Sequence, residues 1–358
     1  MKINQNRLVD SFVKLVQIDS ESGEESEIIA YLEQELTSLR LKTEIDKAGN
    51  LIAVSGPNPV IALIAHTDTV KPGKNIKPII TESGEIKTDG STILGADDKS
   101  GVASILEILQ TLKDNEKQIN LEIVFTVSEE TGLGGSSSLD YTKLKSKQAI
   151  NLDSEPGDIC IGEPAIMQFD IEITGKAAHA GVHPENGIST IQIASEAIGN
   201  LEWGRIDFET TSNVGTINGG LARNIVPEKT TIQAEVRSRS VEKFQKYCQK
   251  LEEEFKKAAE KYHGEVKIDA AQRSNAYVVD TNFPLIQSVA DACNQNGIKP
   301  DIKLIGGITD ANNFNAHGIK AITTGSCGTN IHSTEESIKI TDLALGTRIV
   351  LDTLLSLK

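Results

Sequence analysis

The feature that most constrains the fold is a change of pattern in the middle of the chain. Between about residues 166 and 273 the order of predicted elements is β-α-β-β-α-β. It comprises a strand "MQFDIEITGK", a helix "NGISTIQIASEAIGNL", strands "TSNVGTINGG" and "NIVPEKTTIQAEVRS", a helix "VEKFQKYCQKLEEEFKKAAEKY" and a strand "GEVKIDAAQ". This order is typical of a small ferredoxin-like α+β sandwich. We therefore expect an inserted domain at residues 166–273.

The segments on both sides of this region alternate helices with buried strands. Before it come two amphipathic helices, a hairpin at "KTEIDKAGNLIAVSG" and the strands "IALIAH", "LEIVFTV" and "AINL". After it come "FPLIQSVADACNQNG", "KAITTGS" and a final helix "TDLALGTRIVLDTLLSLK". Such alternation favours an α/β domain with a mixed, mostly parallel sheet. Residues 1–165 and 274–358 are thus predicted to form one domain that the insertion interrupts.

Composition excludes several classes of function. The net charge of −15 disfavours a nucleic-acid partner, because no basic patch offsets it. No apolar run approaches the roughly 20 residues that span a bilayer, so no membrane role is expected. The first residues lack the apolar core and cleavage site of a signal peptide. The four cysteines are widely spaced and form no C-x-x-C pair, so we expect reduced thiols and a cytoplasmic location.

Acidic and histidine side chains follow several of the predicted strands. In open α/β sheets ligands bind near the carboxyl ends of strands, so these side chains are expected to converge. Each alone has an ordinary interpretation, such as a helix cap or a solvated surface charge. Together they would repel one another without a cation, and their chemistry favours a first-row metal, zinc above all. The residues concerned are His66, Asp68, Asp97, Asp98, Glu129, Glu130, Asp153 and His332.

Seven motifs, in this order, resemble those of a known enzyme family. They are "AHTDTV", "GADDKSGVA", "SEETGLGGS", "NLDSE", "GKAAHAG", "GGLARNIVPE" and "GTNIHSTEE". The family is the dizinc exopeptidases, which include peptidase T, carboxypeptidase G, aminoacylase and succinyl-diaminopimelate desuccinylase. The resemblance covers essentially the whole chain, and peptidase T and its tripeptidase-like relatives look most similar. It implies a zinc-exopeptidase-like catalytic domain with an inserted lid or dimerisation domain.

The resemblance also implies roles for individual residues. Glu129 resembles the general base, which takes a proton from zinc-activated water and returns it to the leaving amine. Asp68 would orient His66 from outside the coordination sphere. Two Zn²⁺ ions are implied, with Co²⁺ or Mn²⁺ as possible substitutes. One ion would be held by His66, Asp97 and Asp153, and the other by Asp97, Glu130 and His332.

The inserted domain holds three candidate substrate-binding residues, two of them implied by the resemblance and the third by its side-chain chemistry. His179 matches a histidine that reaches the substrate carbonyl, often across a dimer, so a homodimer is a further expectation. Asn224 resembles a substrate-contacting asparagine. Arg237 could capture a substrate carboxylate, although a surface ion pair is an equally good interpretation. The remaining histidines, His183, His263 and His317, are expected to be structural or surface residues.

The predicted function is a metallo-exopeptidase that acts on short peptides, with tripeptides favoured. An N-acyl amino-acid hydrolase such as an aminoacylase, or another dizinc amidohydrolase, would use the same motifs. A catalytic thiol at Cys327 is a minor alternative, and this residue departs from the plainest family pattern. Asp310 is expected to support the pocket. A non-catalytic binding protein is disfavoured, because such a relative should have lost the base or a ligand.

Overall fold

The computed structural model describes residues 1–357, which divide into two compact units. The flanking unit comprises Met1–Gly162 and the described residues from Val278 onward, and the inserted unit is Glu163–Tyr277. The boundaries lie slightly outside the expected 166–273. The strands β8 (Asp158–Glu163) and β9 (Ala165–Thr174) are separated by a single residue, so the extended chain crosses the boundary without a change of pattern.

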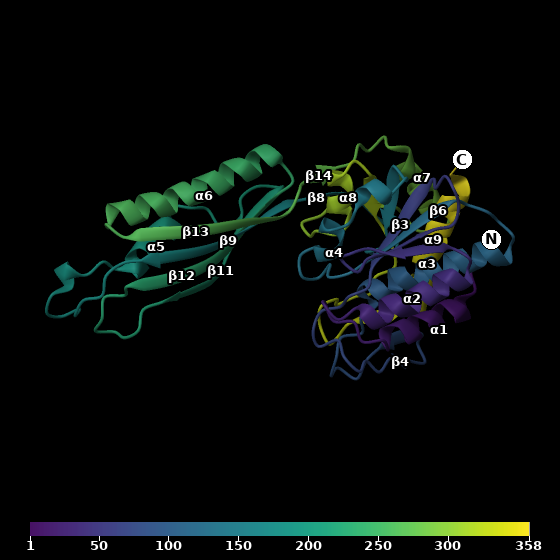
Figure 1. Cartoon of the computed structure of the whole chain (residues 1–358), viewed down its shortest axis with the longest axis horizontal. Coiled ribbons are helices and arrows are strands. Elements are labelled where there is room, and N and C mark those ends of the chain that lie inside the picture. The colour runs from purple at the N-terminus through teal and green to yellow at the C-terminus, as the bar shows by residue number, and fades with distance from the viewer. Residues whose placement is uncertain (358) are drawn as a thin grey trace. The chain divides into compact units, whose positions relative to one another are not determined.

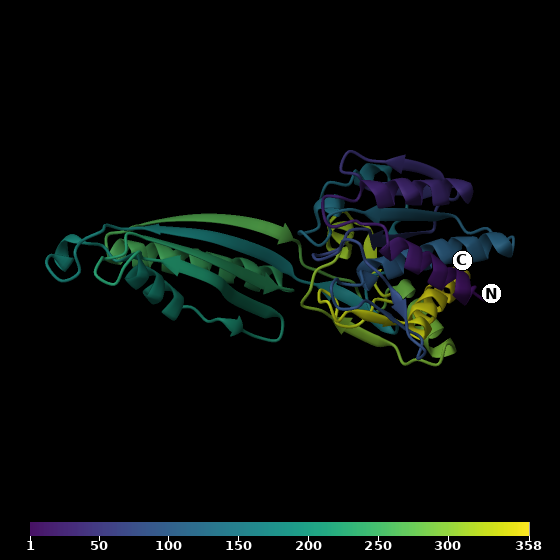
Figure 2. The ribbon, with the colours of Figure 1, turned by 90° about the horizontal axis from the view of Figure 1, so that it is seen from below.

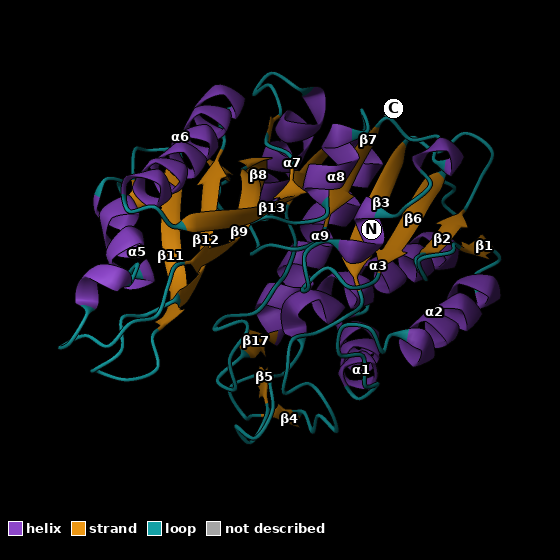
Figure 3. Ribbon diagram, turned by 60° about the vertical axis from the view of Figure 1, so that its left-hand side comes forward, coloured by secondary structure: helices purple, strands orange, loops and turns teal. Residues whose placement is uncertain are grey.

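A mixed sheet forms the centre of the flanking unit (Figure 3). Within the described residues it has nine strands in the order β1-β2-β6-β3-β7-β16-β8-β14, with β15 beside β8. The pairs β6–β3, β3–β7, β7–β16 and β8–β15 are parallel, and the hairpin pair β1–β2 is antiparallel as predicted. The expected mixed, mostly parallel sheet is therefore confirmed. Its other strands are β1 (Lys42–Ile45), β2 (Leu51–Val54), β3 (Ile61–His66), β6 (Leu121–Thr126), β7 (Gln148–Asn151), β14 (Tyr277–Val278), β15 (Asp301–Leu304) and β16 (Lys320–Thr323).

Helices cover this sheet and bury its apolar strands. Every residue of β3 and β6 is buried, as expected for parallel strands with both faces covered. The helix α3 packs on β3, and α1 and α9 pack on α3, while α2 lies against β1 and β2. The helices are α1 (Gln5–Val16), α2 (Ser26–Ser38), α3 (Ala96–Asp114), α4 (Gly134–Ser137), α7 (Pro284–Gln295), α8 (Ala311–Ala316) and α9 (Ile340–Ser356), with a 3-10 turn at Tyr141–Lys143.

The parallel strands bring distant parts of the chain to one edge of the sheet. The strand β3 ends at His66, β6 ends at Thr126 shortly before the two glutamates, and β7 ends at Asn151 shortly before Asp153. Because β3 lies between β6 and β7 and is parallel to both, these three carboxyl ends are neighbours. A small antiparallel sheet, β17 (Ser337–Lys339), β5 (Glu85–Lys87) and β4 (Ile79–Ile80), holds the segment that follows His332.

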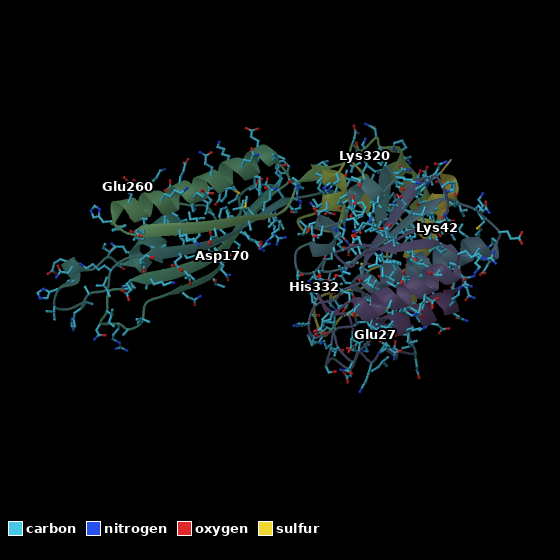
Figure 4. The ribbon with its side chains drawn as sticks, viewed as in Figure 1. Glu27, Lys42, Asp170, Glu260, Lys320 and His332 are labelled. Carbon is cyan, nitrogen blue, oxygen red and sulfur yellow. The ribbon has the colours of Figure 1, made fainter. Side chains whose placement is uncertain are left out.

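The inserted unit is an antiparallel sheet with two helices on one face (Figures 1 and 2). Its strand order is β10-β11-β12-β9-β13, in which the four long strands have the predicted ferredoxin-like arrangement. Residues of β9 alternate between a core under the helices and a polar face, on which Asp170 is labelled in Figure 4. The remaining elements are β10 (Gly204–Arg205), β11 (Thr210–Gly219), β12 (Lys229–Ser238), β13 (Glu265–Ser274), α5 (Thr190–Gly199), α6 (Val241–Lys261) and a 3-10 turn at Pro184–Asn186.

Among the described residues no helix is both long and apolar enough to cross a membrane.

Candidate metal centre and active site

Asp97 stands between two histidines that come from distant parts of the chain. Its Oδ1 atom lies 3.0 Å from His66 Nε2, at the end of β3. Its Oδ2 atom lies 3.3 Å from Nε2 of His332, which is labelled in Figure 4 on the loop between β16 and β17. The same His332 nitrogen is 2.9 Å from Glu130 Oε2. Each oxygen of Asp97 therefore faces a different imidazole, which is the arrangement that a bridging carboxylate requires.

Two sets of donor atoms in the flanking unit could each hold a metal ion. Within each set the donor atoms lie within 4.8 Å of one another, and Asp97 belongs to both. Three protein donors per ion leave coordination positions open, as in catalytic rather than structural zinc sites. A further set at this spacing, Asp98, Asp153 and Cys327, shares Asp153 with the first. The two sets that meet at Asp97 are His66–Asp97–Asp153 and Asp97–Glu130–His332.

The charges of the polypeptide alone show why a cation fits here. Burial raises the pKa of Asp153 well above its ordinary value, and the neighbouring carboxyl groups of Asp97 and Asp98 raise it further. Burial also raises the pKa of Asp98, whose Oδ2 atom is buried without a hydrogen-bond partner. Several carboxyl groups thus cannot all be ionised in this space unless positive charge joins them. Divalent ions would supply that charge, so the donor set fits a two-metal centre.

In the polypeptide alone the two histidines supply part of that charge. Burial disfavours a charged His66, but its hydrogen bonds to Asp68 and Asp97 outweigh burial and raise its pKa well above 6.5. Hydrogen bonds to Asp97 and Glu130 raise the pKa of His332 to about 10. Burial opposes ionisation of Asp97, yet hydrogen bonds from both histidines lower its pKa. A metal ion that binds must therefore displace protons from the imidazoles.

Asp68 contacts both His66 and the segment that carries the two glutamates. Because β3 ends at His66, Asp68 lies on the following loop rather than on the strand. His66 Nδ1 is 3.0 Å from the backbone carbonyl oxygen of Asp68 and 3.4 Å from its Oδ1 atom, so Nε2 is turned toward Asp97. The Asp68 carboxylate also accepts hydrogen bonds from the backbone N–H groups of Glu129 (2.9 Å) and Glu130 (3.2 Å). The sequence predicted the contact between Asp68 and His66 but not the contacts of Asp68 with the backbone of Glu129 and Glu130.

Glu129 is the candidate general base, and its surroundings favour the protonated form. Burial raises its pKa well above 4.5; His66 acts in the opposite direction, and the carboxyl groups of Asp310, Glu130 and Asp97 raise it further. A carboxylate whose proton affinity is increased in this way is better able to accept a proton and to deliver it again.

With this geometry established, the chain can be compared with known proteins. Residues 62–356 match the sequence profile described as Peptidase family M20/M25/M40. The chain belongs to this family. The structure of a tripeptidase from Staphylococcus aureus is similar, with 33% identity, a TM-score of 0.96, and coverage of 99% of this chain and 98% of that one. The structure of aminopeptidase PepT from Bacillus cereus has 36% identity, a TM-score of 0.93 and 98% coverage of both chains. Peptidase T from a Geobacillus strain is 25% identical over 97% of this chain and 98% of its own length.

The candidate substrate residues of this M20/M25/M40 peptidase all lie in the inserted unit. His179 and Asn224 are exposed and come from adjacent segments, because the backbone N–H of Ala180 donates to the Asn224 carbonyl (3.0 Å). Arg237 lies near the opposite end of β12 from the Asn224 segment. Its Nε atom forms an ion pair with Glu235 at 2.8 Å. The structure thus brings His179 and Asn224 together but not Arg237.

The three remaining histidines belong to neither of the two donor sets that meet at Asp97. His183 and His263 are exposed in the inserted unit. His317 stacks on the Tyr141 ring, with centroids 3.9 Å apart, and its Nδ1 atom is 2.8 Å from the carbonyl oxygen of Asn313. These contacts are those of surface and structural histidines.

Asp310 and Cys327 are buried near the candidate centre. Asp310 accepts a hydrogen bond of 2.5 Å from Thr126 Oγ1, at the end of β6. Cys327 Sγ lies 3.6 Å from Asp153 Oδ1 and 3.7 Å from Asp98 Oδ1. Burial raises the pKa of the Cys327 thiol well above 9.0, and the same two carboxyl groups raise it further. This environment disfavours the thiolate that a nucleophilic cysteine needs.

Several residues that hold the site together were not singled out in the sequence. Glu25 Oε1 accepts hydrogen bonds from the backbone N–H (2.9 Å) and hydroxyl (3.0 Å) of Ser128, directly before the candidate base. Lys99 is fully buried, and its Nζ atom donates to the carbonyl of Ile18 at 2.8 Å. The one sequence signal for a role of Lys99 was its place among the buried positions of α3. Glu25 lies in the acidic stretch "SESGEESE", where nothing distinguishes it from its neighbours.

Proposed function

We propose that the chain is a two-metal aminopeptidase that releases the N-terminal residue of tripeptides. The observation that carries this proposal is the pair of three-donor sets that meet at Asp97, with the half-buried Glu129 next to the proposed ligand Glu130. The similarity to a tripeptidase and to an aminopeptidase over nearly the whole chain supports the choice of substrate.

Zinc is the metal that we propose for both positions. Imidazole nitrogens combined with carboxylate oxygens, three from the protein per ion, match the usual ligands of catalytic zinc. When bound, two such ions would polarise a scissile carbonyl group and increase the acidity of water between them. The proposed ligands are those of the two donor sets, His66, Asp97 and Asp153 for one ion and Asp97, Glu130 and His332 for the other.

The chain's own residues would supply proton transfer and alignment. We assign to Glu129 the transfer of a proton from the attacking water to the leaving amine, a role suited to a carboxyl group with a raised pKa. Asp68 would keep Glu129 in place through its bond to the Glu129 backbone N–H. It would also keep His66 Nε2 directed at Asp97, because it holds the opposite ring nitrogen.

The inserted unit has a separate part in this proposal. We propose that His179 stabilises the charge on the substrate oxygen, that Asn224 contacts the substrate, and that Arg237 recognises its carboxylate. We further propose a homodimer formed through this unit and a cytoplasmic location. All four cysteines lie within the described residues, are buried and form no disulfide there, which suits a reducing compartment. Sedimentation velocity at several protein concentrations would test the dimer.

The decisive experiment compares a free tripeptide with an N-acylated dipeptide, using protein reconstituted with Zn²⁺. The wild type should release the N-terminal residue of the tripeptide and leave the acylated compound largely intact. Glu129→Ala should retain two ions but lose about 10²–10⁴-fold in kcat, the usual contribution of a general base. The matched variant Glu130→Gln should instead lose activity together with one ion.

Preferential hydrolysis of the acylated compound would assign the chain to the aminoacylase-like enzymes. Absence of turnover with either compound at full metal loading would contradict an enzymatic role. Loss of an ion from Glu129→Ala would show that this residue is a ligand rather than the base.

A further inference from the structure

The segment that carries His332 is a small hairpin. Thr329 and Ser337 close its base with two backbone hydrogen bonds, Thr329 N–H to Ser337 O (2.8 Å) and Ser337 N–H to Thr329 O (3.1 Å). His332 lies within the hairpin with a φ of 61°, in the left-handed region. We call residues 329–337 the His332 hairpin. Glu336 lies at the base of this hairpin, next to Ser337.

The side chain of Glu336 connects this hairpin to the segment that leads to Asp97. Its Oε2 atom accepts hydrogen bonds from the backbone N–H groups of Leu94 (2.8 Å) and Gly95 (2.7 Å). Its Oε1 atom accepts a third from the backbone N–H of Asp97 (3.1 Å). Only 1% of Glu336 is exposed. One buried carboxylate therefore links two segments that are some 240 residues apart in the sequence.

The segment from Leu94 to Asp97 needs such an acceptor because its backbone is irregular. Gly95 has a φ of 75°, and Asp97 and Asp98 have non-helical φ and ψ values at the start of α3. Their N–H groups cannot all join a regular helical ladder, and buried N–H groups without partners are costly. A carboxylate also interacts favourably with the positive end of a helix. Glu336 meets both requirements from outside the segment.

We propose that Glu336 is a positioning residue that docks the His332 hairpin onto the Leu94–Asp97 segment. In this way it sets the spacing between His332 and Asp97, which share the second metal ion. The inference rests on the function proposed above, since it concerns ligands of the same centre. The other proposed ligands of the first ion, His66 and Asp153, follow β3 and β7 instead and do not lie on the hairpin.

The test is a Zn²⁺ titration of the metal-free protein in three forms: wild type, Glu336→Gln and Glu335→Gln. Both variants remove one negative charge from the same hairpin, but Glu335 is exposed and Glu336 is buried. A glutamine at 336 keeps one acceptor oxygen and turns an N–H₂ donor toward backbone N–H groups. We expect Glu336→Gln to bind the second ion about 10–100-fold more weakly, the usual effect of removing a residue that supports a ligand. The first ion should be weakened less than the second, because Asp97 is the one member of its donor set that contacts Glu336. Glu335→Gln should match the wild type for both ions.

Unchanged binding of both ions by Glu336→Gln would overturn the proposal, and so would an equal weakening of both, which a general loss of structure produces. A wild type that binds fewer than two ions would overturn the proposed function itself, and this is visible before any variant is compared.

Hydrogen exchange of the wild type provides a second test that needs no variant to fold. The amides of Leu94 and Gly95 should be protected in the metal-free protein, because Glu336 accepts from both. Filling the second site should slow exchange in Leu94–Asp97 and in the His332 hairpin together. Fast exchange at Leu94 and Gly95, or a response confined to one of the two segments, would contradict the proposed docking.

Discussion

Replacement of Asp68 by asparagine tests how the candidate base is held. The carboxylate accepts three hydrogen bonds: from Glu129 N–H at Oδ1, and from Glu130 N–H and Ser22 Oγ at Oδ2. Asparagine keeps the shape but offers only one acceptor oxygen. Whichever way the amide turns, the backbone N–H of Glu129 or of Glu130 then faces an N–H₂ group. Asp68→Asn therefore removes an acceptor from a segment that carries both the base and a metal ligand.

The size of the effect follows from these contacts. Asp68 is fully buried, so one buried N–H without an acceptor costs about 1–3 kcal/mol. Loss of the charge weakens the remaining bonds by about 1 kcal/mol more, because hydrogen bonds to charged groups are stronger than neutral ones. The expected loss of unfolding free energy is thus about 2–4 kcal/mol. Displacement of Glu129 should lower kcat by roughly 10–100-fold, as for other residues that support metal sites.

Denaturant unfolding and tripeptide hydrolysis at full metal loading would measure the two effects. The matched control is Ser22→Ala, which removes one bond to Asp68 and keeps the carboxylate. It should cost about 1 kcal/mol and change kcat little. If Asp68→Asn had a kcat within a few-fold of the wild type, the carboxylate would not be holding the base. If excess metal restored the kcat of Asp68→Asn in full, Asp68 would act only by orienting His66 and not by holding Glu129.

Metal removal should destabilise the protein more at high pH. Burial is the main cause of the raised pKa values of Asp98 and Asp153. These raised values stabilise the folded metal-free chain at a pH below the unfolded pKa, which is near 3.8. This stabilisation is lost as the pH rises through the pKa values of the folded protein. The pKa of His332, about 10 when folded, acts in the same direction between 6.5 and about 10. The Tm of the metal-free protein should therefore fall as the pH rises, and the gain on adding Zn²⁺ should grow; a constant gain would contradict this. Gly101→Ala should cost about 1–3 kcal/mol by urea unfolding, because a Cβ atom would lie 2.4 Å from Asp98 Oδ1; unchanged stability would contradict the close packing. Glu107→Gln should destabilise the fold by about 1–3 kcal/mol, because it weakens the ion pair between the buried Glu107 and the partly exposed Arg7 of α1, and should leave kcat unchanged; a lower kcat would refute a purely structural role.

Much of the fold could be predicted because it depends on local patterns. Strand and helix periodicities fixed the α/β alternation and the ferredoxin-like insertion, and the hairpin at residues 42–54 followed from its turn residues. The small sheet of β4, β5 and β17 was not predicted, because strands of two or three residues leave too short a pattern. The irregular start of α3 was also missed, since "GADDKSGVA" is equally compatible with a regular helix cap.

The residues that gather at the candidate centre could be named because imidazole and carboxylate groups at strand ends are visible in a sequence. The backbone contacts of Asp68 and Glu336 show what is not visible. Each is a buried carboxylate that accepts hydrogen bonds from backbone N–H groups, and a backbone N–H group cannot be recognised from residue type. Asp68 fixes the segment of Glu129 and Glu130, and Glu336 fixes the segment of Asp97. Peptide N–H groups stabilise both carboxylates, and His66 stabilises Asp68 as well. Asp68 and Glu336 therefore hold the segments that carry the proposed ligands. Two of the carboxylates that would bind the metal ions, Asp97 and Glu130, lie next to the Nε2 atoms of the two histidines.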